Sequence, residues 1–332
     1  MVERGVILVT GGAGYIGSHV LLALRAANWP VIVLDDLSTG RRAAIPADVR
    51  LVVGDIGDRS LLAQLFKRQR IRAVLHFAGS VQVAESTRQP LAYYRNNTLN
   101  SQCLIEACIA AGTDALVFSS TAAVYGNPAR VPVNEDAPTE PLNPYGRSKL
   151  MTEQILGDAE AAHGLRHVIL RYFNVAGADP SGRAELATAG ATHLLKAACE
   201  AALGKRPAVP LFGDDYPTPD GTCVRDFIHV SDLADAHLKA LEHLLGGGPS
   251  RTLNCGYGRG YSVRQVLAMV ARVSGRRLTI TPAARRPGDA VEVVAAAERI
   301  RHELGWQPRY DDLEQIVRDA LRFEQQLLDA PS

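Results

Sequence analysis

A tyrosine and a lysine four positions apart, Tyr145 and Lys149, are the residues of this sequence best suited to move a proton. On a helix these two positions lie on one face, so the ammonium would stand beside the phenol. A free phenol has a pKa of about 10 and is a poor base at neutral pH, but a nearby cation stabilises the phenolate. The pair therefore predicts that Tyr145 acts as a proton acceptor. The alternative is that two surface residues share this spacing by chance.

A threonine offers a second group for the same chemistry. Thr121 ends a Ser-Ser-Thr run that follows a predicted strand at 115–119. The tyrosine and lysine belong to a helix that begins at Asn143-Pro144, a favourable N-cap followed by proline at the first helical position, and runs to about residue 162. Thr121 is therefore predicted to hydrogen-bond the substrate hydroxyl whose proton Tyr145 removes.

Three glycines at every third position, Gly11, Gly14 and Gly17, follow an apolar run at Val6–Thr10. The apolar residues after them have helical spacing, so the glycines join a buried strand to a helix. Such a junction lets the backbone approach a diphosphate closely and presents unpaired amides at the positive end of the helix. The pattern predicts a nucleotide-binding turn.

A carboxylate extends this prediction to the choice of cofactor. Asp35 follows a second predicted strand at 30–34, about 20 residues after the glycines, where dinucleotide-binding folds place the acid that accepts the ribose hydroxyls. An anion there repels a 2′-phosphate, which favours NAD over NADP. Arg41 and Arg42 could hold such a phosphate, but we interpret them as solvated loop charges.

The elements that would position these residues alternate between strand and helix. Further strands are predicted at 49–53, 73–76 and 168–172, with helices at 59–70 and 90–111. Alternation of this kind predicts a Rossmann-type, doubly wound parallel sheet that binds ligands at the carboxyl ends of its strands. The residues that follow the third and fourth strands then face the cofactor: Asp55 and Ile56 toward the adenine, and Phe77, Ala78 and Gly79 toward the ribose and pyrophosphate.

The pattern loosens after residue 176, where glycine and proline multiply. We predict an NAD-binding domain over 1–176 with returning segments at about 226–258, and a smaller α/β substrate domain over 177–225 and 259–332 that ends in an amphipathic helix at 313–328.

Composition limits the function classes. The 332 residues are 47% hydrophobic and 21% charged with a net charge of +1, which favours neither nucleic acid nor a membrane surface as partner. No stretch is apolar and long enough to span a bilayer, and the first residues run directly into a strand, so we expect a cytoplasmic protein. The five cysteines include no CxxC pair, which predicts reduced thiols and no metal.

A series of motifs along nearly the whole chain resembles the extended short-chain dehydrogenase/reductase family, and within it the UDP-glucose 4-epimerases. The motifs occur in the family's order: TGGAGYIGSH (10–19), LDDLSTG (34–40), GDI (54–56), HFAG (76–79), SSTAAVYG (119–126), NPYGRSKL (143–150), RYFN (171–174), DYPTPDGTCVRDFIHV (215–230) and RRPGD (285–289).

The resemblance implies a role for particular residues. Tyr145, Lys149 and Thr121 would be catalytic, and a UDP-sugar would be the substrate. NAD would contact Gly11, Gly14, Tyr15, Ile16, Gly17, Asp35, Asp55, Ile56, Phe77, Ala78, Gly79, Asn97, Tyr145, Lys149 and Tyr172. The UDP-sugar would contact Thr121, Asn174, Thr192, His193, Leu194, Arg225, Arg286, Asp289 and Val293. The two arginines suit a diphosphate, because a guanidinium pairs with it through two hydrogen bonds, although intramolecular salt bridges to Asp226 or Asp289 are the alternative.

The implied reaction is inversion at C4 of the sugar. The Tyr145 phenolate would take the 4-hydroxyl proton while a hydride passes to NAD, and the resulting ketone would turn over and recover the hydride on its other face. Dehydratases and decarboxylases of the family follow the threonine with an acidic residue, whereas Ala122 and Ala123 stand here. This favours return of the hydride.

Three positions depart from the best-known members. Val81 stands where some have a pyrophosphate-binding lysine, and Val175 replaces a common proline. Val293 stands where some have a bulky tyrosine that limits the sugar pocket, which suggests that N-acetylated UDP-hexoses are accepted too.

The family usually forms a homodimer through the helices at 90–111 and 145–162, and we expect the same here, although their apolar faces could also just cover the sheet. Two other functions stay open at this point: a 4-epimerase of UDP-glucuronate or a UDP-pentose, and a non-catalytic NAD-sensing protein.

Overall fold

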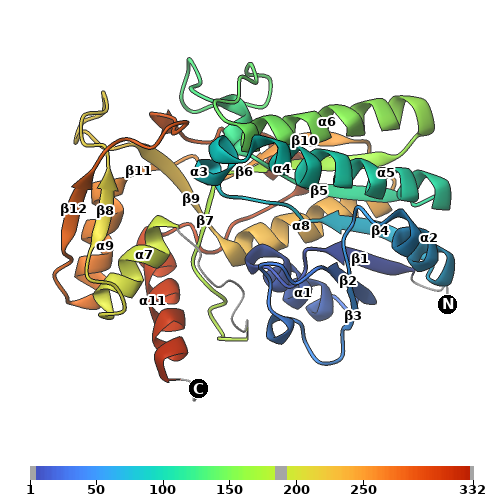
Figure 1. Cartoon of the computed structure of the whole chain (residues 1–332), viewed down its shortest axis with the longest axis horizontal. Coiled ribbons are helices and arrows are strands. Elements are labelled where there is room, and N and C mark those ends of the chain that lie inside the picture. The colour runs from blue at the N-terminus through green and yellow to red at the C-terminus, as the bar shows by residue number, and fades with distance from the viewer. Residues whose placement is uncertain (1–4, 184–192, 330–332) are drawn as a thin grey trace.

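A parallel sheet forms the centre of the larger half of the molecule (Figure 1). The structure is a computed structural model that describes residues 5–183 and 193–329, and within them seven strands pair in the order β10-β6-β5-β4-β1-β2-β3. The strands are short and mostly buried, as expected for a sheet covered on both faces. Their bounds are β1 Val6–Thr10, β2 Val31–Asp35, β3 Arg50–Val53, β4 Ile71–His76, β5 Ala115–Thr121, β6 Arg166–Tyr172 and β10 Arg251–Cys255.

The strand order reverses between β1 and β4, because β2 and β3 lie to one side of β1 and the later strands to the other. In a doubly wound sheet, such a point leaves a crevice at the carboxyl ends of the two strands where ligands bind. The glycine turn after β1 and the Phe77–Gly79 turn after β4 therefore meet at the switch point.

Helices cover both faces of this sheet (Figure 1). One layer holds α2 and α5 (Asn100–Ala111) side by side with α6, and α1 packs against α8 on the opposite face. These helices and the short ones near them have the bounds α1 Tyr15–Ala26, η1 Arg42–Ala44, α2 Arg59–Arg68, α3 Val83–Arg88, η3 Ala122–Tyr125, α6 Pro144–His163, α8 Val230–Leu245 and α10 Glu298–Leu304.

The single helix predicted over 90–111 is wrong in one respect. It consists of α4 (Pro90–Tyr93), a π-helical stretch η2 (Tyr94–Leu99) and α5 (Asn100–Ala111). A π-helical turn inserts an extra residue and changes the direction of the side chains that follow, and such turns are frequent at functional sites. Here the wider turn contains Asn97, one of the predicted cofactor contacts.

The smaller part of the molecule contains two further sheets, with helices packed beside them (Figure 1). In one, β9 (Val224–His229) lies between β11 (Gly260–Ser262) and β13 (Glu292–Val293) and also pairs with β7 (Asn174–Ala176). The other joins β8 to β12. The remaining bounds are β8 Val209–Phe212, β12 Ile280–Ala283, α7 Leu194–Ala202, α9 Val263–Ser274 and α11 Leu313–Asp329.

The three helices of this part share a hydrophobic core of their own with β9, in which Leu195, Cys199, Phe227, Val266 and Val317 are buried. None of the helices that the structure describes is both long and apolar enough to cross a membrane.

Candidate active site

Two glycines allow the backbone of the nucleotide-binding turn to fold tightly. Gly11 has a φ of +71°, and a Cβ placed on it would lie 2.5 Å from the Ala78 amide nitrogen in the turn after β4. A Cβ on Gly17 would lie 2.3 Å from the Gly11 carbonyl oxygen. Only glycine fits at both positions, because real carbon atoms do not approach so closely. The two turns at the switch point are thus in direct backbone contact.

The start of α1 is suited to an anion. Gly14 is its N-cap and, among the described residues, no side chain caps the helix there. The first amides of a helix have no intrahelical partner and lie at its positive end. A diphosphate bound over Tyr15, Ile16 and Gly17 would satisfy them.

Asp35 stands at the end of β2 beside this turn. One carboxylate oxygen accepts the Ala13 N–H at 2.9 Å and the other accepts the Leu37 N–H at 2.9 Å. Burial raises the pKa of Asp35, and these two hydrogen bonds oppose the rise. The side chain is held in place with acceptor capacity left for ribose hydroxyls, while Arg41 and Arg42 are exposed.

Tyr145 and Thr121 face each other at the carboxyl end of β5. The Thr121 hydroxyl lies close enough to the Tyr145 phenol to lower its pKa, and its oxygen accepts the Ala123 N–H at 3.1 Å. Tyr145 is 7% exposed and Thr121 is 8% exposed. A substrate hydroxyl that reached this pair would meet one hydroxyl donor and one phenol in a nearly dry environment.

Lys149 reaches the same strand end from one turn further along α6. Its Nζ donates to the Ser119 carbonyl oxygen at 3.1 Å and lies 4.9 Å from the centre of the Phe118 ring. It is also 3.6 Å from the position that a Cβ on Gly79 would take. The ammonium therefore lies near both the end of β5 and the Gly79 turn, which joins two groups of residues that the sequence analysis treated separately.

The pKa of Tyr145 differs from the sequence-based expectation. Burial raises the pKa of this phenol, and the hydrogen bond with Thr121 opposes the rise without overcoming it. Burial lowers the pKa of Lys149 itself to about 8, and the charge of Glu153 opposes that fall. Lowering the phenol pKa therefore requires positive charge from a bound cofactor.

Asn97, in the π-helical stretch, connects the cofactor turn to the catalytic helix. Its Oδ1 accepts the Ser80 N–H at 2.7 Å, and its Nδ2 donates to the Ser80 carbonyl at 3.0 Å and to the Ser148 hydroxyl at 3.0 Å. Ser148 in turn donates to the Tyr145 carbonyl at 2.7 Å. Asn97 is 1% exposed. Besides the predicted NAD contact, its hydrogen bonds hold the Ser80 backbone next to Ser148 of α6.

His237 is a residue that the sequence analysis missed. Its Nδ1 donates to the Leu233 carbonyl at 2.9 Å, which leaves Nε2 to accept the Ser119 hydroxyl at 2.8 Å. Burial lowers the pKa of His237 to about 4, so the ring is neutral at pH 7. The centres of the Phe77 and Tyr172 rings lie 4.7 Å and 6.4 Å from the centre of the imidazole. His237 thus holds two predicted cofactor contacts in place.

A buried ion pair between Arg171 and Glu153 is hydrogen-bonded to the carboxyl end of β5. The guanidinium of Arg171 donates to Glu153 at 2.6 Å through Nη2 and at 3.1 Å through Nε, and Ser120 also donates to this carboxylate. Arg171 Nη1 donates to the Tyr125 hydroxyl at 3.0 Å. Glu153 lies four residues after Lys149, so its helical spacing could have indicated this connection.

The predicted substrate arginines do not form the salt bridges considered as the alternative. Asp226 accepts backbone N–H groups instead, including that of Gly258 at 2.8 Å. Arg225 donates to the Ala290 carbonyl at 2.7 Å, and Arg286 lies 3.8 Å over the Phe212 ring. Among the described residues, neither arginine has a carboxylate partner within salt-bridge distance. Burial raises the pKa of Asp289, against the charges of both arginines.

The other predicted contacts are more scattered. Asp55 accepts the Asn100 amide at 3.0 Å, Ile56 is 4% exposed, and Asn174 begins β7. His193 and Leu194 form the N-terminus of α7, and Thr192 lies outside the described residues. Val293 is 6% exposed and belongs to the hydrophobic core, opposite Arg225 in the β9–β13 pair.

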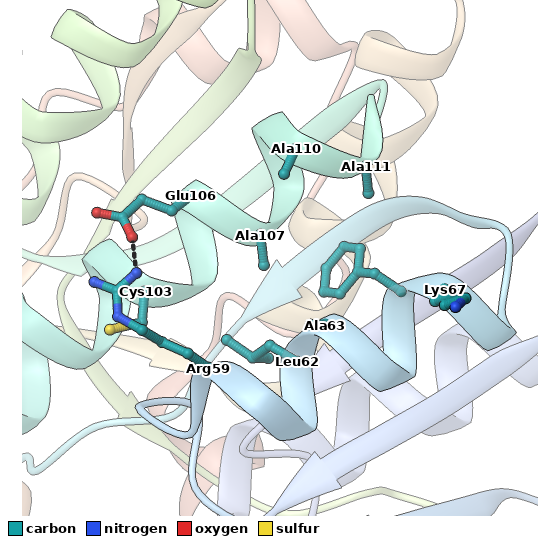
Figure 2. A pocket seen from close by; sticks show the side chains of 10 residues that line it. Arg59, Leu62, Ala63, Lys67, Cys103, Glu106, Ala107, Ala110 and Ala111 are labelled. Atoms are coloured by element: carbon teal, nitrogen blue, oxygen red, sulfur yellow. Dashed lines mark hydrogen bonds and ion pairs between the residues drawn. The ribbon is translucent and has the colours of Figure 1, made fainter.

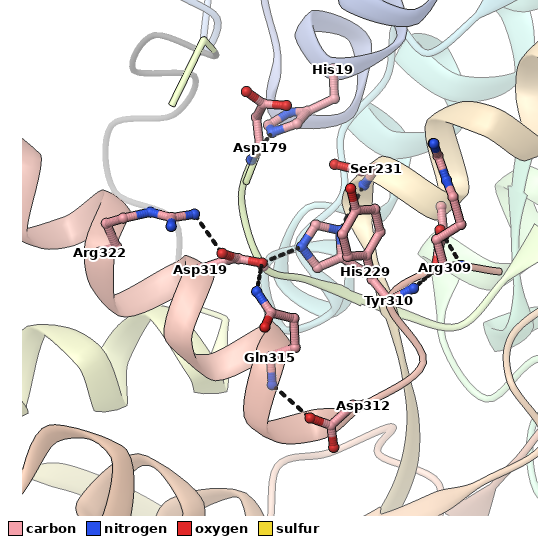
Figure 3. Close-up of polar contacts among 12 residues, drawn as sticks. His19, Asp179, His229, Ser231, Arg309, Tyr310, Asp312, Gln315, Asp319 and Arg322 are labelled. Atoms are coloured by element: carbon pink, nitrogen blue, oxygen red, sulfur yellow. Dashed lines mark hydrogen bonds and ion pairs between the residues drawn. The ribbon is translucent and has the colours of Figure 1, made fainter. Parts of the chain in front are cut away.

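The segment 177–183 is hydrogen-bonded to α1. The Tyr15 hydroxyl donates to the Gly177 carbonyl at 2.6 Å, and His19 Nε2 accepts the Asp179 N–H at 3.1 Å. Close by, His229 Nε2 lies 3.3 Å from a carboxylate oxygen of Asp319 in α11, and both side chains are 0% exposed (Figure 3).

A separate groove between α2 and α5 has a volume of about 470 Å³ (Figure 2). Its lining is mainly small and apolar, and an ion pair between Arg59 and Glu106 crosses one end. None of the predicted site residues lines it, so it is not part of the candidate active site.

These features match a known family along most of the chain. The model of the NAD dependent epimerase/dehydratase family matches residues 7–256. The chain belongs to this family. A curated relative, the UDP-glucose 4-epimerase of Azospirillum brasilense, is 63% identical over 321 residues, which are 97% of this chain and 92% of the relative.

Solved structures of UDP-glucose 4-epimerases have the same fold as this chain. The UDP-glucose 4-epimerase of Bifidobacterium longum in complex with NAD+ and UDP is 35% identical, with a TM-score of 0.92 and coverage of 97% of this chain and 98% of that one. The UDP-Glc/GlcNAc 4-epimerase of Campylobacter jejuni is 45% identical, with a TM-score of 0.83 and coverage of 97% and 99%. The predicted family, Rossmann-type fold and NAD cofactor are confirmed.

Proposed function

We propose that this chain interconverts UDP-glucose and UDP-galactose by inversion at C4 of the hexose. The observation that carries the proposal is the proximity of Thr121 and Tyr145 at the carboxyl end of β5, where the Lys149 ammonium contacts Ser119 and lies near the Gly79 turn. Bound NAD supplies the site that accepts the C4 hydride and later returns it. The protein's own groups move the proton of the 4-hydroxyl.

The residues at the switch point fit this cofactor. Gly11 and Gly17 leave space that no other residue would leave, α1 offers uncapped amides to the diphosphate, and Asp35 is held for the ribose. Thr121 orients the sugar hydroxyl and Tyr145 takes its proton. Burial raises the pKa of Tyr145 and so favours the neutral phenol, and positive charge from a bound cofactor would stabilise the phenolate, which is the form that accepts the proton of the sugar hydroxyl.

On the substrate side, Arg225, Arg286 and Asp289 bind the uridine diphosphate, and Asn174, Thr192, His193 and Leu194 complete the substrate site. Arg286 has its guanidinium over an aromatic ring and no carboxylate partner among the described residues, so its donors are available to a phosphate. A grip on the nucleotide alone lets the hexose turn over between the two hydride transfers. The predicted division into a domain of 1–176 with 226–258 and a domain of 177–225 with 259–332 is part of this proposal.

The test is to mix the purified chain with UDP-galactose, without added NAD, and follow the sugar anomers by NMR. Conversion to UDP-glucose is expected. The Tyr145→Phe variant should keep its cofactor but react about 10²–10⁴-fold more slowly, because it lacks the proton acceptor. UDP-glucuronate and a UDP-pentose, run in parallel, test the other substrates. Cofactor retention without turnover of any of these sugars would favour a non-catalytic NAD-binding protein.

A second proposal concerns the size of the sugar. Val293 is small, and it stands in β13 next to the substrate arginine Arg225. We infer that UDP-N-acetylhexosamines are also accepted, and that Val293→Tyr narrows the range to the plain hexoses. Absence of UDP-N-acetylglucosamine turnover at high concentrations of the unmodified enzyme would contradict this.

We also propose a homodimer and a cytoplasmic location. Leu104 and Cys108 of α5 cover the sheet, but Leu91, Leu99 and Met151 of the neighbouring helical face are 79%, 54% and 41% exposed. A second copy packed on this face would bury them, and analytical ultracentrifugation of Leu99→Asp against the unmodified chain tests the dimer.

The five cysteines are free thiols, which suits a reducing compartment such as the proposed cytoplasm.

A further inference from the structure

Asn143 lies where the catalytic helix meets the turn that carries Arg286 and Asp289. Its Oδ1 accepts the Gly146 N–H at 2.9 Å and so caps α6, as the sequence predicted. Its Nδ2 donates to the carbonyl of Gly288 at 3.2 Å. The side chain is 3% exposed. Both ends of one planar amide are therefore used, each by a different half of the proposed site.

The turn at 285–289 is packed closely against this side chain. Gly288 has a φ of +84°, and a Cβ on it would lie 3.2 Å from the Cβ of Asn143. Just beyond the turn, the Val291 N–H donates to Asn127 Oδ1 at 2.9 Å. Two asparagine side chains from the larger half thus hold the segment whose guanidinium we assign to the diphosphate.

Helix capping alone does not explain the choice of asparagine. Serine and aspartate cap helices about as well, because each offers an oxygen to the amides of the first turn. An ionised aspartate has no donor, and a serine hydroxyl donates and accepts from a single short-reaching atom, whereas the asparagine amide has a separate acceptor for Gly146 and donor for the Gly288 carbonyl. The second hydrogen bond is what distinguishes Asn143 from an ordinary N-cap.

We propose that Asn143 is a positioning residue that fixes the diphosphate-binding turn relative to the catalytic Tyr145, two residues along the same helix. The inference rests on the proposed function, since it assigns the turn to the uridine diphosphate. Through this amide, the location of the nucleotide sets where the sugar C4 meets the phenol. Loss of the hydrogen bond from Asn143 to Gly288 should weaken the binding of UDP and leave Tyr145 and Thr121 in place.

Two variants separate this role from capping. Asn143→Ser keeps the cap but is too short to reach Gly288, and Asn143→Asp keeps the cap but sets a carboxylate oxygen against the Gly288 carbonyl. We expect the Kd of UDP, measured by calorimetry on the NAD-loaded protein, to rise about fivefold for Ser, the effect of one hydrogen bond, and further for Asp. The KM of UDP-galactose should rise in parallel, with kcat within about twofold. The thermal midpoint should be nearly unchanged for Asn143→Ser, which buries no charge, and lower for Asn143→Asp, whose carboxylate is buried without a partner.

A matched control comes from another N-cap. Asp58 caps α2 by accepting the N–H groups of Ser60 and Leu61, and Asp58→Ser should leave UDP binding and KM unaltered. If UDP affinity and KM stay at the unmodified value in both Asn143 variants, or if kcat falls while UDP affinity holds, the inference is overturned. Failure of the unmodified chain to bind UDP would contradict the proposed function itself, which the same calorimetry reports first.

Discussion

Removal of one charge from the buried Arg171–Glu153 pair should be among the most destabilising single changes near the site. The change we consider is Glu153→Gln, which keeps the shape of the side chain and removes its charge. The pair has an N–O distance of 2.6 Å, and the two side chains are 9% and 5% exposed. The guanidinium would keep its charge in surroundings that exclude water.

The magnitude follows from that burial. Breaking a buried ion pair from one side costs about 3–5 kcal/mol, because the remaining charge loses its partner without regaining water. We expect about 3 kcal/mol for glutamine, since its amide oxygen still accepts from the guanidinium. The Ser120 hydroxyl also donates to Glu153, so part of the loss should appear in the strand end that carries Thr121.

A surface pair of the same geometry supplies the control. Asp48 accepts Arg25 Nη2 at 2.9 Å and Nε at 3.1 Å, but the two side chains are 64% and 41% exposed. Asp48→Asn should cost less than about 1 kcal/mol, because solvent screens an exposed pair.

Urea unfolding of the NAD-saturated proteins, followed by circular dichroism, measures both free energies from the midpoints at equal m-values. If Glu153→Gln loses no more than Asp48→Asn, the reasoning from burial is refuted.

The remaining predictions concern pH and the glycine turn. Burial lowers the pKa of Lys149 to about 8, below lysine's ordinary value of about 10.4, so the ammonium loses its proton as pH rises through about 8. kcat/KM should fall above that pH, and in Glu153→Gln the fall should begin at a lower pH; a rate that stays level to about pH 10 would argue against it. Gly17→Ala places a Cβ 2.3 Å from the Gly11 carbonyl and should release NAD on gel filtration, whereas Gly157→Ala in α6, with nothing within 4 Å, should retain it.

Much of the scaffold could be predicted because it depends on neighbours in the chain. The alternation of short apolar runs with helical periodicity indicated the parallel sheet, and strands such as Val6–Thr10 were located to the residue. Asn143 was identified as an N-cap because capping is a local hydrogen bond. The spacing of Gly11, Gly14 and Gly17 indicated the cofactor turn for the same reason, since it reflects the backbone needs of one junction.

Other features depend on residues far apart in the chain. Ser119 and His237 are 118 positions apart, and no spacing rule connects them. The π-helical turn at Tyr94–Leu99 coincides with long-range hydrogen bonds from Asn97 to Ser80 and Ser148, whereas helical periodicity predicts an unbroken helix.

By itself the sequence determined which groups this protein has for its chemistry and at which strand ends they lie, because strand, turn and helix signals are local. Only the tertiary structure decided how deeply these groups are buried and which hydrogen bonds they form. It buried Tyr145, which raises the pKa of the phenol, and turned the Lys149 ammonium to the Ser119 carbonyl. It also set one side of the Asn143 amide against Gly288. Desolvation and hydrogen bonding are properties of the folded surroundings, and the order of residues along a helix does not specify them.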